Sequence, residues 1–189
     1  MIFLISLLIC IILHESAHLL TAKIVKCKVE VFSIGFGKQL FSFTYKGTKY
    51  RIALIPIGGY NKLEHEIDYC RNKNALPNLP YRKKLLVILS GCYVNIITGL
   101  MGYFLGMKFN NYNLCYFGWI STLLGITNLL PIPALDGSYP ILFLMEKVIP
   151  KKYALQLMRF LITWGFILLM TLNILCLPYL VYLIRTGRL

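Results

Sequence analysis

The chain has 189 residues, of which 58% are hydrophobic and only 14% are charged. It carries a net charge of +13, from 20 Lys and Arg against 7 Asp and Glu. Such a composition excludes a disordered chain and an ordinary soluble domain, and it is typical of a membrane protein. In a membrane protein, excess positive charge indicates topology and contact with anionic lipid, so we expect membrane lipid, and no nucleic acid, as a partner.

Long uncharged segments predict an all-α polytopic membrane protein that forms a single domain over residues 1–189. The hydrophobic run at the N-terminus, residues 1–13, is shorter than the roughly 20 residues that cross a bilayer, so the first helix must continue to about Ala22. A cleaved signal peptide is the alternative, but the segment has no basic n-region. The predicted spans are about four, at residues 1–22, 85–107, 112–135 and 158–184.

Two short apolar runs, residues 40–45 and 50–55, follow the first span and flank the turn sequence Lys46-Gly47-Thr48-Lys49. This pattern predicts a β-hairpin within residues 29–60. The stretch from Asn61 to Lys84 mixes charges with Asn and Pro, and we expect it to be a flexible linker.

Basic residues predict the orientation of the chain in the membrane. Residues 23–84 hold 13 Lys and Arg against 4 acidic residues, whereas the loop after the second span offers only Lys108. The positive-inside rule therefore places residues 23–84, and with them the hairpin, on the cytoplasmic face. Both termini are then on the outer side. We expect a multi-pass protein, in a bacterial cell membrane.

The first span contains the motif HExxH at residues 14–18. His14 and His18 are one helical turn apart and project from one face, and Glu15 beside them can act as general base on a metal-bound water. The alternative is a pair of packed core histidines. Ionisable side chains at membrane depth are costly unless they find partners or a wet cavity, which favours a zinc site.

A zinc site needs a third protein ligand at the same depth, and Asp136 is the candidate. It is the only acidic residue between Tyr69 and Met145. The predicted third span runs inward like the first, so both deliver their ligands near the cytoplasmic side. An N-cap for a helix starting near Ser138 is the alternative role for Asp136.

Small and polar residues repeat on one face of the first two spans and predict a closely packed bundle. Asn95 lies on this face, where it either holds two helices together or lines the site. Asn128 carries the same ambiguity, because it precedes Asp136 by about two turns. The two faces comprise Ser6, Cys10, His14 and His18 on the first span and Gly91, Asn95, Gly99, Gly102 and Gly106 on the second.

HExxH in the first span and NxxPxPxLDG at residues 128–137 resemble the site-2 protease family of intramembrane zinc metalloproteases, peptidase family M50. Residues 35–37 (GFG) and 56–60 (PIGGY) resemble further segments of that family, and Gly91 with Asn95 resembles its AGPxxN motif. The resemblance covers residues 14 to about 150 in the family's order. Cys92 stands where the family has Pro, and Ser138 where it more often has Gly.

By this resemblance, one Zn²⁺ per chain is held by His14, His18 and Asp136, and Glu15 activates the attacking water. Asn128 and Asn95 line the site as oxyanion or substrate contacts. The chain resembles a minimal form of the family, without a PDZ or CBS domain, which leaves open how substrates are screened.

The implied function is zinc-dependent hydrolysis of a peptide bond within or near the cytoplasmic end of a substrate's transmembrane helix. The expected partners are a transmembrane protein substrate, lipid and a regulatory membrane protein. A membrane transporter using the same His, Glu and Asp is one alternative, although the fourth predicted span offers almost no polar residues for a pathway. A non-catalytic membrane interaction protein is the other, although all four residues are present.

A substrate that arrives as a helix must be extended before it is cut. We hypothesise that residues 50–55 form an edge strand that holds the unwound substrate by strand addition, and a plain surface hairpin is the alternative.

Overall fold

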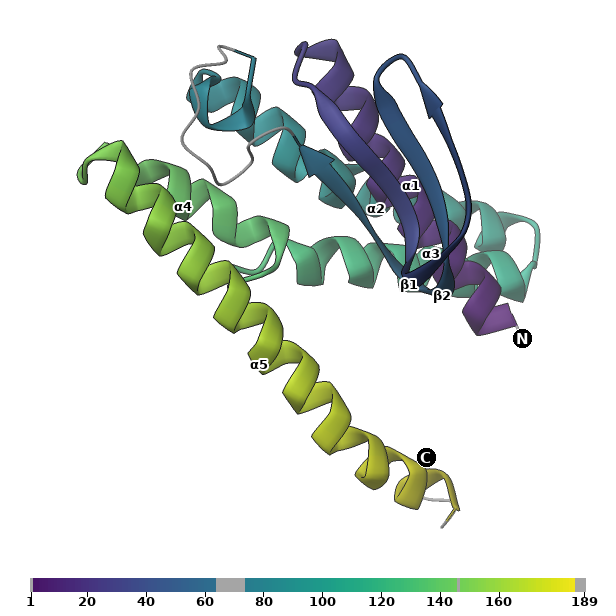
Figure 1. Cartoon of the computed structure of the whole chain (residues 1–189). Coiled ribbons are helices and arrows are strands. Elements are labelled where there is room, and N and C mark those ends of the chain that lie inside the picture. The colour runs from purple at the N-terminus through teal and green to yellow at the C-terminus, as the bar shows by residue number, and fades with distance from the viewer. Residues whose placement is uncertain (1, 64–73, 146, 186–189) are drawn as a thin grey trace.

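The computed structural model describes residues 2–63, 74–145 and 147–185. It is mainly helical, with one small sheet between the first two long helices (Figure 1). In chain order the helices and strands are α1 (Ile2–Ile24), β1 (Val29–Tyr45), β2 (Thr48–Leu63), α2 (Tyr81–Lys108), α3 (Tyr112–Asn128), α4 (Tyr139–Met145) and α5 (Lys151–Arg185), with 3₁₀ turns at Leu76–Asn78 and Asp136–Ser138.

Helices α1, α2 and α3 form a bundle whose contact faces are the small and polar faces predicted from the sequence. All four residues of the α1 face and all five of the α2 face are buried. Helices α2 and α3 approach so closely that a Cβ added to Gly118 would lie 2.3 Å from the backbone nitrogen of Tyr103. The prediction of a closely packed bundle is confirmed.

Two helices of the described residues, α1 and α2, are long and apolar enough to cross a membrane. Helix α3 has 17 residues and ends at Asn128, earlier than the predicted end of the third span at residue 135. Pro131 and Pro133 lie in the loop beyond it, where they cannot continue a helix. Four spans therefore remain a prediction.

The predicted hairpin is present, and its strands are longer than expected. Strands β1 and β2 are joined by Lys46 and Gly47, which both have positive φ (47° and 77°), as a two-residue type I′ turn requires. Strand β2 continues to Leu63, so the first residues of the expected flexible linker are in fact strand. Residues 64–73, the middle of that linker, lie outside the described residues.

Both strands bend, so the sheet is wider than a simple hairpin. Phe32 lies opposite both Tyr50 and Asn61, which places the first half of β1 between two parts of β2. Tyr50 in turn lies opposite Phe43 as well as Phe32. Residues 50–52 are thus paired on both sides, and the hypothesis that residues 50–55 form an edge strand is wrong for them.

A different part of β2 forms one edge of the sheet, and residues 39–45 of β1 form the other. Among the described residues, 59–63 pair on one side only, with residues 29–34 of β1. This edge segment follows Gly58 and lies beside α1. The sequence could not reveal this, because the alternating pattern does not show which strand a segment pairs with.

The main hydrophobic core lies at the end of the bundle where α1 ends and α2 begins. It joins α1, the sheet, the start of α2, α4 and the start of α5. From this core α5 runs past the loop that follows α3, and Figure 1 shows its C-terminal part extending away from the other helices. A Cβ added to Gly165 of α5 would lie 2.4 Å from the Cβ of Pro133, so helix and loop are in close contact.

Candidate metal centre

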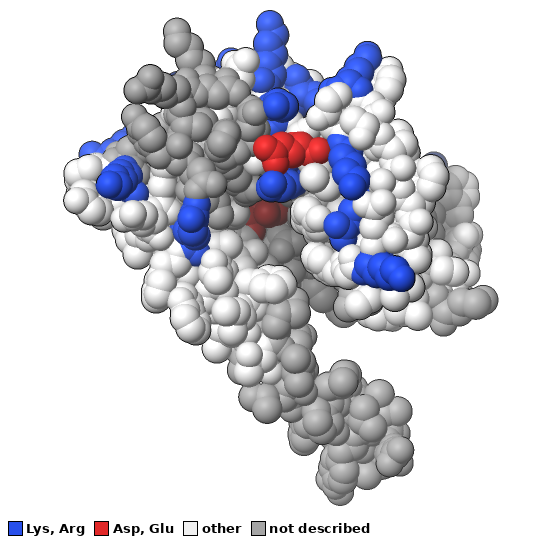
Figure 2. Space-filling model, in the orientation of Figure 1, with Lys and Arg blue, Asp and Glu red and all other residues white. Residues whose placement is uncertain are grey.

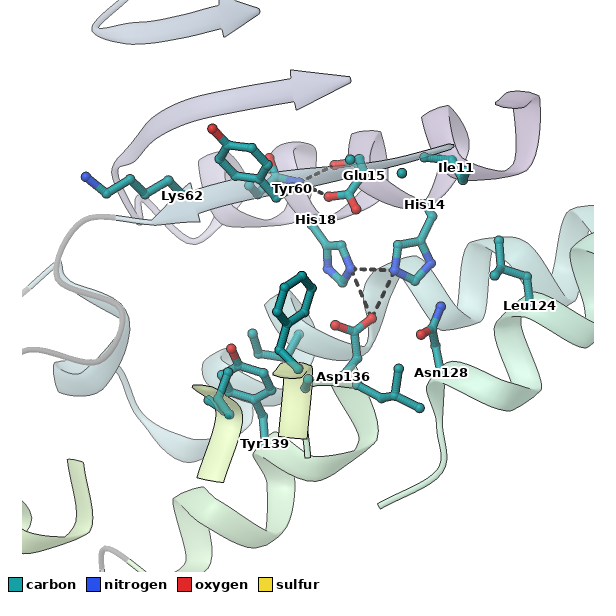
Figure 3. Close-up of a pocket in the computed structure, with 18 of the residues that line it drawn as sticks. Ile11, His14, Glu15, His18, Tyr60, Lys62, Leu124, Asn128, Asp136 and Tyr139 are labelled. Carbon is teal, nitrogen blue, oxygen red and sulfur yellow. Dashed lines mark hydrogen bonds and ion pairs between the residues drawn. The ribbon is translucent and has the colours of Figure 1, made fainter. Parts of the chain in front are cut away.

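Three potential metal ligands from two parts of the chain converge in the bundle (Figure 3). His14 and His18 come from one face of α1, and Asp136 comes from the 3₁₀ turn beyond α3. The Oδ2 atom of Asp136 lies 3.0 Å from His14 Nε2 and 3.2 Å from His18 Nε2, and the two Nε2 atoms are 3.0 Å apart. The carboxylate therefore faces the imidazoles instead of capping α4.

The three donor atoms fit a zinc ion. Nitrogen and oxygen ligands at 2.0–2.2 Å in tetrahedral geometry are separated by about 3.3 Å, close to the spacing seen here. Two imidazoles and one carboxylate make up the donor set of catalytic zinc sites, in which the fourth position holds water or substrate. His14 and His18 are buried, and the Asp136 side chain is 22% exposed, so the donors lie at the wall of a cavity.

The far side of each imidazole is held so that Nε2 faces the other donors. His18 Nδ1 lies 2.8 Å from the carbonyl oxygen of Val87 in α2. A carbonyl only accepts, so Nδ1 carries the proton, and the Nε2 lone pair is free for a metal. The backbone of α2 thus selects the tautomer of His18.

Asn95 of α2 lies against Nδ1 of His14. The amide is fully buried, its Nδ2 lies 3.3 Å from His14 Nδ1, and its Oδ1 has no hydrogen-bond partner among the described residues. Amide nitrogen and oxygen are interchanged by a half-turn. After that half-turn Oδ1 accepts a proton from Nδ1, which is the pairing that metal ligation through Nε2 requires.

Glu15 lies beside the donors and is held by the sheet. Asn61 of β2 donates from Nδ2 to the carboxylate Oε2 and to the main-chain oxygen of Glu15, both at 2.8 Å. Gly59 permits this contact, since a Cβ there would lie 2.7 Å from Glu15 Cγ. Asn61 is not among the predicted site residues, because the charged and polar stretch that it begins favours a linker. The signal available was the PIGGY segment, which continues directly into Asn61.

The metal donors and Glu15 line a cavity of about 780 Å³. Asn128 also lines it, whereas Asn95 lies behind His14 and does not. Apolar side chains from α1, α3 and α5 form much of the remaining wall, including Leu7, Ile11, Leu124, Ile162 and Phe166. Such a cavity can hold an apolar peptide segment with one of its carbonyl groups beside the metal donors.

Lys62 lies at the β2 side of the cavity and pairs with Glu30 across the sheet, with 2.8 Å between Nζ and Oε2. The hydrogen bond to Glu30, followed by its charge, raises the pKa of Lys62. This ammonium group therefore stays charged at neutral pH.

Comparison with known proteins identifies the family. Residues 2–116 and 110–172 match the family described as Peptidase family M50. The chain is 39% identical over 98 residues to a protein of Campylobacter jejuni named "Putative zinc metalloprotease Cj1068", with 49% of this chain and 27% of that protein covered. A "Putative zinc metalloprotease" of Helicobacter pylori strain J99 is 38% identical over 103 residues, covering 50% of this chain and 29% of that protein.

A similarly named protein of Chlamydia pneumoniae is 34% identical over 142 residues, with 65% of this chain and 23% of that protein covered. The matched regions thus span less than a third of the length of these relatives. The family match spans most of the chain and includes the residues that form the metal centre. The chain belongs to peptidase family M50, the site-2 protease family, and zinc is the metal that its donor set holds.

Proposed function

We propose that this chain is an intramembrane zinc endopeptidase that hydrolyses a peptide bond near the cytoplasmic end of a substrate's transmembrane helix. The observation that carries the proposal is the convergence of His14, His18 and Asp136 with Glu15 on one cavity inside an apolar helical bundle. A purely structural histidine pair would not need a carboxylate beside it and a cavity in front of it.

The residues divide the chemistry between them. When bound, Zn²⁺ lowers the pKa of a water in its fourth position and polarises the scissile carbonyl. Glu15 accepts the proton of the attacking water and passes it to the leaving amine. Asn128 lines the same cavity and can donate to the carbonyl oxygen as negative charge develops there.

The sheet offers a way to hold the substrate extended. Residues 59–63 form a strand edge, and residues 58–63 line the cavity that contains the metal donors. An unwound substrate segment can add to this edge through its main chain, which is how peptides join exposed strands in other complexes. We therefore propose that the substrate adds to residues 59–63, and no longer to residues 50–55.

The cytoplasmic placement of the cut rests on charge. In Figure 2 the Lys and Arg side chains gather mainly in the upper part of the view, the end where α1 finishes and α4 and α5 meet. The positive-inside rule assigns this end to the cytoplasm. The named relatives are bacterial, which supports the cell membrane of a bacterium as the location.

The test is cleavage of a membrane-spanning peptide by the purified chain in proteoliposomes, beside Glu15→Gln. We expect the wild type to cut near one end of the peptide's span and to stop when a zinc chelator is added. Glu15→Gln should retain zinc and lose cleavage by about 100-fold or more, because the amide cannot accept the water proton. Undiminished cleavage by Glu15→Gln would contradict the proposal.

A further inference from the structure

Asn61 makes two hydrogen bonds to one residue, and both identify the direction of its amide. Nδ2 lies 2.8 Å from Glu15 Oε2 and 2.8 Å from the Glu15 main-chain oxygen. A carbonyl oxygen cannot donate, so the Asn61 group that faces it must be the NH₂. The bonds therefore fix the Glu15 side chain to its own helix backbone through a residue of another element.

The strand that carries Asn61 is itself firmly held. Asn61 lies opposite Phe32, which is buried in the main core. The ring of the preceding residue, Tyr60, stacks on Phe36, with 6.3 Å between centroids and 12° between planes. Gly59 approaches Glu15 so closely that any side chain there would collide with it. The sheet is thus shaped to bring Asn61 against Glu15.

The remaining polar atom of Asn61 points to a role during the reaction. Its Oδ1 is buried and has no hydrogen-bond partner among the described residues, although Asn61 lines the cavity. Buried acceptors are almost always satisfied. The missing donor is therefore to be sought in what binds at this strand edge, such as an N–H of an extended substrate.

We propose that Asn61 is a positioning residue for the general base. It holds Oε2 of Glu15 in place, so that Oε1 takes the water proton while Oε2 remains bonded in both protonation states. Because the same residue lies on the strand edge beside the cavity, it ties the placement of the substrate to the placement of the base. This inference rests on the proposed function.

Two variants distinguish the hydrogen bonds that Asn61 donates from the space that its side chain fills. Asn61→Ala removes both hydrogen bonds, and Asn61→Asp keeps the shape but replaces the donor with an acceptor. Gln39→Ala is the matched control, since it removes an amide that donates to Ser42 at 2.8 Å on the exposed part of the same sheet. Zinc content, kcat, KM and the affinity for a zinc-binding peptide hydroxamate are measured for each.

If Asn61 positions Glu15, both Asn61 variants lower kcat about tenfold or more, with KM and zinc content within about twofold of the wild type. Gln39→Ala leaves all four quantities unchanged. A kcat within about twofold of the wild type in Asn61→Asp would overturn the inference, because shape alone would then suffice. Loss of zinc together with kcat in both variants would also overturn it, because Asn61 would then act on the metal site.

The hydroxamate provides a readout that needs no turnover. It binds the metal and presents a hydroxyl to the base, so a displaced Glu15 weakens it by about tenfold in the Asn61 variants. If the wild type cleaves no peptide but the Asn61 variants still bind the hydroxamate more weakly than the wild type does, the inference stands and the proposed function is wrong. Equal binding with normal cleavage would remove the inference and leave the proposed function.

Discussion

Gly91 contributes no atom to the metal centre, yet the two histidines need it. A Cβ at this position would lie 2.5 Å from His18 Nε2 and 2.7 Å from His14 Cε1, inside the contact distance of both rings. At Gly91, helix α2 therefore brings bare backbone against the imidazoles. One turn to either side, the carbonyl oxygen of Val87 contacts Nδ1 of His18, and the side chain of Asn95 contacts Nδ1 of His14. The ligands come from α1 and Asp136, but α2 orients them.

We predict that Gly91→Ala weakens zinc binding by about 10- to 100-fold, because the methyl group displaces both imidazoles. Competition with a chromophoric zinc chelator measures the affinity. Gly102→Ala is the control, since it makes the same substitution in α2, where the nearest atom is the Cδ1 of Phe117 at 3.1 Å. Equal zinc affinity in Gly91→Ala and the wild type would mean that the rings do not need this space.

Some residues of the site could be predicted from the sequence, and others could not. His14, Glu15 and His18 could be predicted from the sequence. The two histidines share one helical face, and three ionisable side chains at membrane depth are costly unless they bind something. Asp136 followed from its isolation in an uncharged stretch. Asn61 was missed, and Gly91 was named only as part of a small-residue face and of a motif, because their contacts with α1 depend on sheet register and helix packing.

Glycines also determine how the elements pack. Helices α2 and α3 share an interface in which Gly99 faces Thr122 and Gly118 faces Tyr103. Here an added Cβ would meet main-chain atoms, which cannot move aside as a side chain can. In a membrane, where apolar burial does not favour one helix over lipid, this close approach supplies much of the association energy. The interface holds α3 in place, and α3 leads to Asp136.

At this interface we predict that Gly118→Val destabilises the chain by about 1–3 kcal/mol, because the helices must separate to admit the side chain. Thermal unfolding in detergent, followed by circular dichroism, gives the change in midpoint. Met101→Ala serves as the control, since Met101 is 57% exposed on α2. A midpoint for Gly118→Val as high as that of the control would refute the importance of this contact.

Element boundaries show what the sequence determines and what it does not. The ends of α1 and α2 were predicted to within a few residues, because hydrophobic length and the basic flanks determine them. The predicted third span was too long, because Leu129 and Leu130 are apolar and yet no longer belong to α3. The second pairing of β1 was not predictable, because apolar alternation does not distinguish an interior strand from an edge.

At the scale of the whole molecule, the basic residues gather mainly at one end, the end that the positive-inside rule predicts to be cytoplasmic (Figure 2). Residues 23–63, the start of α2 and the start of α5 hold 13 of the 20 Lys and Arg, and the main core lies among these elements. The metal donors lie in the helical bundle and line the cavity that the sheet also borders. This is the arrangement that the proposed hydrolysis of a membrane-embedded substrate requires.

The predicted orientation can be tested with single cysteines in a background without native cysteines. Lys49→Cys on the hairpin should react with an impermeant maleimide only in inside-out vesicles, because the positive-inside rule places it in the cytoplasm. Lys108→Cys at the end of α2 should react only in right-side-out vesicles. Both positions are exposed in the structure. Reaction of both cysteines from the same side would be incompatible with a single crossing by α2.

The central claim is that His14, His18 and Asp136 hold one zinc ion, and zinc content tests it most directly. The measurement is zinc per chain in purified, detergent-solubilised protein, with Asp136→Ala beside the wild type. We predict about one zinc in the wild type and much less in the variant, because two imidazoles alone leave the site one ligand short. A well-folded wild type without zinc, or an equal zinc content in Asp136→Ala, would contradict the account.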